Sequence, residues 1–255
     1  MVKQDLYISM ADNHKTVIID AIRNASKKDI MEFRMERKVE TFNSVHFLKW
    51  DFINTNLIRT LPTSQFQCVK IKRGPLWELV LIYDKETQYL YAAMQEKRFH
   101  QLSERTYKET VHYIDALSSI NCDLEANVKL NPAKQLSLFE SENDDWNAQV
   151  EYELNSMLHM LEGEVKRFVL ITFSTEKGEI ASVNAIMPNA KLEITYEENW
   201  NEFITADFSI ALESQGAIAA EQEEEIFVGL REGVISHQQN DDLVQLRDDE
   251  TEKEG

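Results

Sequence analysis

Two segments of the sequence each contain three apolar runs separated by short turns, and this repeated pattern constrains the fold more than any other feature. Alternation within the runs and turn-forming residues between them are typical of β-strands. In the first segment the runs are residues 65–72, 76–83 and 89–93. In the second segment they are residues 165–173, 180–187 and 192–196. Each segment therefore predicts a three-stranded antiparallel meander.

Apolar residues at helical spacing flank both meanders. The predicted helices are residues 12–26, with Asp12 as the cap, and residues 28–40, 52–61 and 146–162. Residues 42–50 alternate loosely and predict a further strand, and a helix is expected around Trp200. The chain has only 7 glycines and 4 prolines, which disfavours an all-β fold with many tight turns. The predicted fold class is α+β.

Because each meander has its own flanking helices, the pattern predicts two lobes. Residues 1–122 form the first and residues 146–237 the second, with a linker or long excursion at 123–145. Residues 238–255 combine few apolar side chains with many carboxylates and predict a disordered acidic tail.

The net charge of −18 is distributed unevenly along the chain. Residues 1–139 carry 20 basic and 17 acidic side chains, a balance of +3, whereas residues 140–255 carry 7 and 28, a balance of −21. An acidic surface repels nucleic acids and membranes and attracts basic proteins. The second half is therefore expected to bind a protein with a basic surface rather than nucleic acid. The candidate carboxylates are Glu197, Glu198, Glu223, Glu224 and Glu225.

The expected compartment is the cytoplasm. The first residues show no apolar core of a signal peptide, and no apolar run approaches the length of a membrane span. Cys68 and Cys122 lack metal-ligand or redox spacing and are expected to be reduced thiols.

Familiar catalytic motifs are absent from the sequence. There is no glycine-rich phosphate loop and no GxSxG sequence, and none of the 6 histidines falls in an HExxH or related pattern. No cofactor or metal site is predicted, and the balance favours a non-enzymatic protein.

One pattern keeps an enzymatic alternative open. Asp84 follows a predicted buried strand, and Gln95-Glu96-Lys97 ends the next strand. Metal-dependent nucleases commonly present an acidic residue on one strand and a Glu- or Gln-x-Lys sequence on the next. Such oxygen ligands hold Mg²⁺, and the lysine stabilises negative charge. Asp84 and Lys97 are the catalytic candidates, although Asp84 also suits a local turn.

Basic residues in the first half form two sets near Phe66 and Trp77. They are Lys70, Lys72 and Arg73 on a predicted strand, and Lys27, Lys28, Arg34, Arg37 and Lys38 along a predicted helix. If both sets share a face, they form a surface for an anionic ligand or for the acidic half of the protein. The alternative is an ordinary solvated face.

The segments LWELVLIYDKETQYLYAAMQEKRFHQL, WDFINTNLIRTL and LITFSTEKGEIASVNAIMPNAKLEITYEENW carry a family resemblance. Together with the residues between them, they resemble an uncharacterised family of Gram-positive bacterial and prophage proteins over most of residues 42–204. The resemblance implies a bacterial or phage origin and a role in phage–host conflict. It assigns no activity to any residue.

The leading hypothesis from the sequence is a regulatory or interaction protein that neutralises a toxin or phage-defence protein. The first alternative is a divergent Mg²⁺-dependent nuclease. The second is an acidic nucleic-acid mimic, in which carboxylates replace phosphates. Neither the partner nor the oligomeric state follows from the sequence.

Overall fold

The computed structural model describes residues 7–41, 43–74, 77–105, 110–125 and 144–204. All of them belong to one compact unit, Met1–Phe208. The expected acidic tail, the carboxylates Glu223 to Glu225 and most of the expected linker lie outside the described residues.

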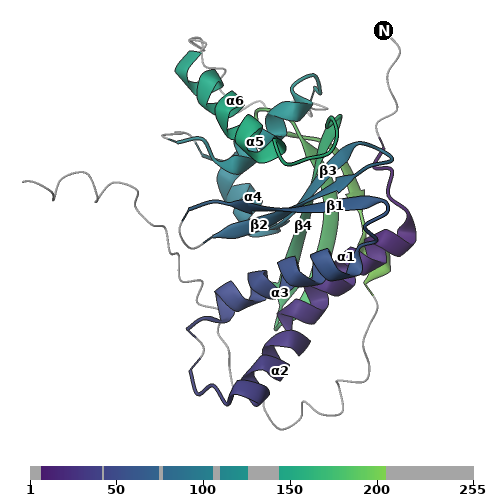
Figure 1. The fold of residues 1–255 in the computed structure, drawn as a ribbon, viewed down its shortest axis with the longest axis vertical. Coiled ribbons are helices and arrows are strands. Elements are labelled where there is room, and N and C mark those ends of the chain that lie inside the picture. Colours follow the sequence, from purple (N-terminus) through teal and green to yellow (C-terminus); the bar gives the residue numbers. More distant parts are fainter. Residues whose placement is uncertain (1–6, 42, 75–76, 106–109, 126–143, 205–255) are drawn as a thin grey trace, which may run out of the picture. The chain divides into compact units, whose positions relative to one another are not determined.

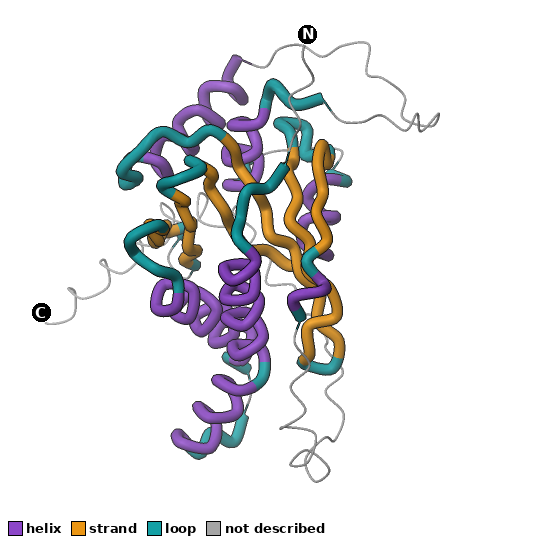
Figure 2. The backbone as a smooth tube through the Cα atoms, turned by 90° about the vertical axis from the view of Figure 1, so that its right-hand side faces the viewer, coloured by secondary structure: helices purple, strands orange, loops and turns teal. Residues whose placement is uncertain are grey.

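Six strands form one sheet in the order β1-β2-β3-β4-β5-β6, and Figure 2 shows them lying side by side. Their bounds are β1 Phe66–Lys72, β2 Glu78–Asp84, β3 Tyr89–Gln95, β4 Arg167–Glu176, β5 Glu179–Pro188 and β6 Ile194–Asn199. Neighbouring strands are antiparallel except for β3 and β4, which are parallel. The sheet is therefore mixed, with β1 and β6 at its edges.

Helices lie on both faces of this sheet (Figure 1). They are α1 Asp12–Ser26, α2 Lys28–Arg37 and α3 Val45–Thr60 on one side, and α4 Glu96–Ser103, α5 Tyr113–Ser118 and α6 Asp144–Leu158 on the other. Side chains alternate across a strand, so β2 contributes to two separate cores. Ile82 packs with α1 and α3, whereas Leu81 packs with α4 and α5. The result is a three-layer α/β/α arrangement.

The α+β class is confirmed, and each of the six strands predicted in the two meanders is present in the sheet. The division into two lobes is not confirmed, because β3 of the first meander pairs with β4 of the second from Tyr89↔Arg167 to Gln95↔Phe173. Parallel neighbours require a long crossover, which here contains α4, α5 and α6. Joining the meanders also removes two exposed strand edges.

Three local predictions are wrong. Residues 45–50 belong to α3 rather than to a strand, because Ile53 and Leu57 recur at helical spacing and are buried. The N-cap of α1 is Ala11, without a side-chain cap, and Asp12 lies in the first turn. The expected helix near Trp200 is only a 3₁₀ turn, η2, at Asn201–Phe203.

Candidate functional site

Asp84 holds a turn together and does not face an open site. It is completely buried at the end of β2. Its Oδ1 accepts a hydrogen bond from the Glu86 backbone N–H at 3.0 Å, and its Oδ2 accepts one from Thr87 Oγ1 at 2.8 Å. Gln65 Nε2 also donates to Oδ1, at 3.4 Å. These contacts satisfy the carboxylate locally, as expected for an aspartate that starts a tight turn.

The structure does not bring Asp84 and Lys97 together. Asp84 pairs with Tyr89 at the start of β3, whereas Lys97 follows the end of that strand, exposed in the first turn of α4. Gln95 lies six positions after Tyr89 along the strand, a span of about 20 Å. We call the Asp84–Tyr89 end of the β2–β3 hairpin the turn end. The opposite end, where β2 begins and β3 finishes, is the open end.

Glu78 is the acidic residue that shares the open end with Gln95. The β2–β3 ladder runs only from Asp84↔Tyr89 to Ile82↔Tyr91, and Glu78 and Gln95 lie beyond it, at the start of β2 and the end of β3. Alternation also places both residues on the sheet face covered by α1 and α3, the face to which Ile82 and Tyr91 contribute. The spacing of Glu78 from Gln95-Glu96-Lys97 was available in the sequence. It was missed because Asp84 lies closer to that sequence.

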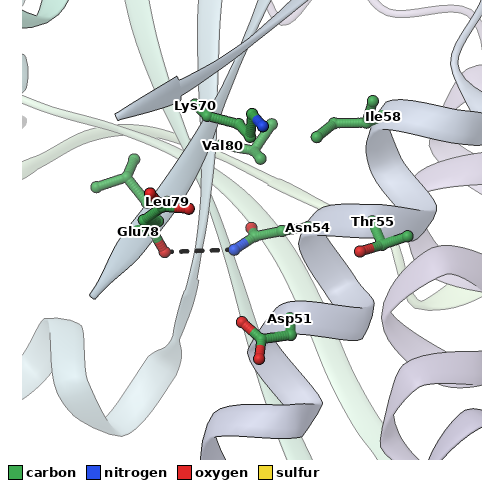
Figure 3. Close-up of a pocket in the computed structure, with 8 residues that line it drawn as sticks. All are labelled: Asp51, Asn54, Thr55, Ile58, Lys70, Glu78, Leu79 and Val80. Carbon is green, nitrogen blue, oxygen red and sulfur yellow. Dashed lines mark hydrogen bonds between the residues drawn. The ribbon is translucent and has the colours of Figure 1, made fainter. Parts of the chain in front are cut away.

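A groove between α3 and the start of β2 brings a second carboxylate to the open end. It has a volume of about 230 Å³. Its lining residues are Asp51, Asn54, Thr55, Ile58, Lys70, Glu78, Leu79 and Val80 (Figure 3). Asn54 Nδ2 donates a hydrogen bond to the Glu78 carbonyl oxygen at 3.3 Å, which ties the helix to the strand. The groove therefore joins elements that are distant in the sequence.

Asp51 and Glu78 are close enough to influence each other electrostatically. Partial burial and the negative charge of Glu78 raise the pKa of the Asp51 carboxyl above its ordinary value. The helix fixes Asp51 there because Ile53 and Leu57 are anchored in the core, which turns Asp51 and Asn54 towards the strands. Two like charges held together in a groove favour a bound cation.

Lysines surround the two carboxylates. Lys70 lines the groove, and Lys72 lies directly across the β1–β2 ladder from Glu78. Lys49, two residues before Asp51, donates from Nζ to Thr175 Oγ1 at 3.3 Å and lies 5.9 Å from the ring centre of Phe173. The region therefore has positive charges around a small acidic centre.

The other predicted binding residues are distributed over separate parts of the fold. Arg34, Arg37 and Lys38 are exposed at the end of α2 and do not join Lys70 and Lys72, because α3 lies between them. One side of α3 contacts α2 through the Phe33–Phe52 ring pair, and another side faces β1 and β2.

Two of the predicted charged residues are held in ion pairs. Arg73 Nη1 pairs with Glu153 Oε2 of α6 at 2.5 Å. On β6, Glu198 Oε1 pairs with Lys15 Nζ at 2.7 Å, whereas the neighbouring Glu197 is exposed. These contacts give Arg73 and Glu198 structural partners within the described unit.

Cysteine chemistry is not favoured at this site. Burial raises the pKa of the Cys68 thiol to about 11, so it is protonated at neutral pH and a poor nucleophile. Within the described ranges, no three histidine, cysteine, aspartate or glutamate side chains are grouped to hold a metal ion. A two-carboxylate site still suits Mg²⁺, which is commonly bound by one or two carboxylates, several waters and substrate phosphates.

The fold and the groove define a three-layer α/β/α protein with a mixed sheet and a carboxylate pair between α3 and the start of β2. The chain belongs to DUF5986, a family of unknown function, whose model matches residues 7–246. No curated protein and no solved structure matches the chain. No helix in the described part of the chain combines the length and apolar character needed to cross a membrane.

Proposed function

We propose that this protein is a divalent-cation-dependent nuclease whose candidate metal ligands are Asp51 and Glu78 in the groove. Gln95 at the end of β3 and Lys97 in the first turn of α4 are the further candidate residues. The observation that carries the proposal is that the Asp51 and Glu78 carboxylates line one groove and interact electrostatically. Gln95-Glu96-Lys97 follows at the end of β3, the strand next to β2 in the sheet. Glu78 takes the role that the sequence pattern suggested for Asp84, since Asp84 is committed to its turn.

The reaction would be hydrolysis of a phosphodiester. The carboxylates of Asp51 and Glu78 and the amide oxygen of Gln95 are hard ligands suited to Mg²⁺. A cation held by these residues would make a water molecule more acidic, and that water would supply the nucleophile for phosphorus while its proton passes to solvent. The bond from phosphorus to the leaving oxygen breaks, and that oxygen takes up a proton, which yields a phosphomonoester and an alcohol. Lys97 would stabilise the negative charge that develops on the phosphoryl oxygens.

The strongly acidic composition does not conflict with this reading of the groove. Residues 205–255 contain 14 acidic and 3 basic side chains, a balance of −11 within the total of −18. More than half of the net charge is therefore carried by residues that follow the described part of the chain. Three lysines lie near the groove: Lys70 lines it, Lys72 pairs with Glu78 across the β1–β2 ladder, and Lys49 lies two residues before Asp51 on α3. Positive charge of this kind attracts phosphates.

The test is cleavage by the purified full chain of labelled single- and double-stranded DNA and RNA, with Mg²⁺ or Mn²⁺ and with EDTA. We expect metal-dependent cleavage that falls at least about 100-fold in Glu78→Gln and in Asp51→Asn, because each removes a ligand charge. Lys97→Ala should lower the cleavage rate while leaving Mn²⁺ affinity within about twofold.

Matched controls make the same chemical changes away from the groove. Glu86→Gln alters an exposed carboxylate at the turn end, and Lys166→Ala removes an exposed lysine just before β4. Both should cleave like the unmodified protein. Absence of cleavage on every substrate, or cleavage that survives both Glu78→Gln and Asp51→Asn, would refute the proposal.

A second candidate function rests on the acidic segment itself. The 14 carboxylates in residues 205–255 favour binding to a partner with a basic surface. In this second proposal the chain is a cytoplasmic protein of bacterial or prophage origin. Its partner is a toxin or defence protein in phage–host conflict. If that partner is a DNA-binding protein that DNA displaces competitively, the chain acts as a nucleic-acid mimic. For either partner, association should slow steeply with added salt and slow further when Glu223, Glu224 and Glu225 become glutamine. An association rate independent of salt would exclude this function.

A further inference from the structure

Aromatic side chains form a continuous patch beside the groove. The ring centres of Trp50 and Trp77 lie 5.6 Å apart, those of Phe47 and Trp77 6.4 Å, and those of Trp50 and Phe173 5.8 Å. Phe173 is fully buried, Trp50 and Trp77 are half-buried, and Phe47 is 38% exposed. The patch therefore runs from the core at Phe173 to the surface at Phe47.

Core packing explains only the inner part of this patch. Trp50 packs against the buried cluster that includes Phe173. Phe47 and Trp77 lie at its outer edge, on the first turn of α3 and immediately before β2, and both retain surface in contact with solvent. Exposed aromatic surface of this kind is enriched at recognition sites.

The same patch adjoins both the proposed ligands and the basic side chains. Trp77 immediately precedes Glu78, and Trp50 immediately precedes Asp51. Lys72 lies across the ladder from Glu78, and Lys49 lies one residue before Trp50. Aromatic faces with adjacent lysines are complementary to unpaired bases on a negatively charged backbone.

We propose that Phe47 and Trp77 form a stacking platform for unpaired bases, which makes single-stranded nucleic acid the substrate class of the site. This inference rests on the proposed nuclease function and specifies its substrate. A base stacked on Trp77 places the adjoining phosphate towards Glu78 and Asp51. In a duplex the bases are already stacked on each other and cannot use the platform.

The test measures binding without cleavage. A fluorescein-labelled 15-nucleotide oligothymidylate is titrated with the full chain in EDTA, and anisotropy gives its Kd; a 15-base-pair duplex is titrated in parallel. We expect tighter binding of the single strand and at least about a fivefold loss of affinity in Trp77→Ala, the lower end of the effect of one stacked base. Trp77→Phe, which keeps an aromatic face, should retain affinity within about threefold.

Control variants separate stacking from folding and from general surface effects. Tyr152→Ala removes a 73% exposed aromatic ring on α6, on the other face of the sheet, and should bind like the unmodified protein. Phe47→Ala should also weaken single-strand binding. Because Phe47 is the more exposed ring, this variant tests the platform even if Trp77→Ala lowers the melting temperature. Lys72→Ala should reduce the salt dependence of binding.

The two proposals can fail separately. Single-strand binding that depends on Trp77 but is never followed by cleavage supports the platform and refutes the nuclease. Metal-dependent cleavage with equal affinity for duplex and single strand, or with unchanged binding in both Trp77→Ala and Phe47→Ala, supports the nuclease and overturns the platform.

Discussion

The two ends of the β2–β3 hairpin each carry an acidic residue of β2, but their surroundings differ. At the turn end, Asp84 is completely buried and accepts hydrogen bonds from Gln65, Glu86 and Thr87. At the open end, Glu78 is exposed, lines a groove and lies near a second carboxylate, Asp51.

This difference separates a structural acid from a candidate functional one. The oxygens of a buried carboxylate surrounded by donors already accept hydrogen bonds from the protein, so they are not available to a ligand. At the open end, the negative charge of Glu78 helps to raise the pKa of Asp51, and a cation added between the two carboxylates would relieve this repulsion. Sequence proximity to Gln95-Glu96-Lys97 favours Asp84, whereas the opposite directions of β2 and β3 put Glu78, not Asp84, at the end of the hairpin where β3 finishes.

The largest expected effect is on stability at the turn end. Asp84→Ala should lower the free energy of unfolding by about 3 kcal/mol or more, because it leaves the Glu86 N–H and the Thr87 hydroxyl without their charged acceptor. Glu78→Ala should cost less than about 0.5 kcal/mol, as is usual for exposed sites. Urea denaturation measures both, and similar costs at the two ends would remove the distinction.

A second prediction concerns His112, the N-cap of α5, whose side chain, like that of Asp84, accepts a hydrogen bond from a backbone N–H within the fold. Its Nδ1 accepts a hydrogen bond from the Ile114 N–H at 3.2 Å. Burial, followed by the positive charge of Arg98, lowers the pKa of His112 to about 3 from its ordinary 6.5. Below pH 6.5 the His112 imidazole is therefore protonated in the unfolded chain but stays neutral in the folded protein, so acid favours unfolding. Stability should fall by about 2 kcal/mol between pH 6.5 and pH 5.

Urea unfolding at a series of pH values measures this decline. His112→Asn keeps a side-chain acceptor at the N-cap but does not titrate, so its stability should vary distinctly less over the same range. An equally steep decline in His112→Asn would show that the histidine is not the source of the pH dependence.

The smallest expected effect concerns cation binding at the open end. Asp51→Asn should weaken Mn²⁺ binding at least about fivefold, roughly 1 kcal/mol, because it removes one ligand charge. In the unmodified protein, affinity should fall as the pH drops through the raised pKa of Asp51, since the protonated carboxyl is a poor ligand. Isothermal titration calorimetry measures both. Equal affinities in Asp51→Asn and Glu86→Gln would exclude the groove as the cation site.

The strands were predictable because apolar alternation and turn residues are local signals. Residues 76–83 and 165–173 show them clearly and match β2 and β4 closely. The strand expected over residues 42–50 failed because a short apolar stretch such as Val45 to Trp50 fits either strand or helix, and packing of Ile53 and Leu57 selected the helix.

The sequence by itself determined the α+β class, the six strands of the two meanders, the Gln95-Glu96-Lys97 pattern and the concentration of acidic residues in residues 140–255. Only the tertiary structure decided that the two meanders form one sheet, and that Asp51 of α3 meets Glu78 rather than Asp84 at the open end. The physical reason is the range of the forces involved. Turn and strand preferences act over a few neighbouring residues, whereas the β3–β4 pairing and the docking of α3 bring together residues separated by tens of positions, which local patterns do not encode.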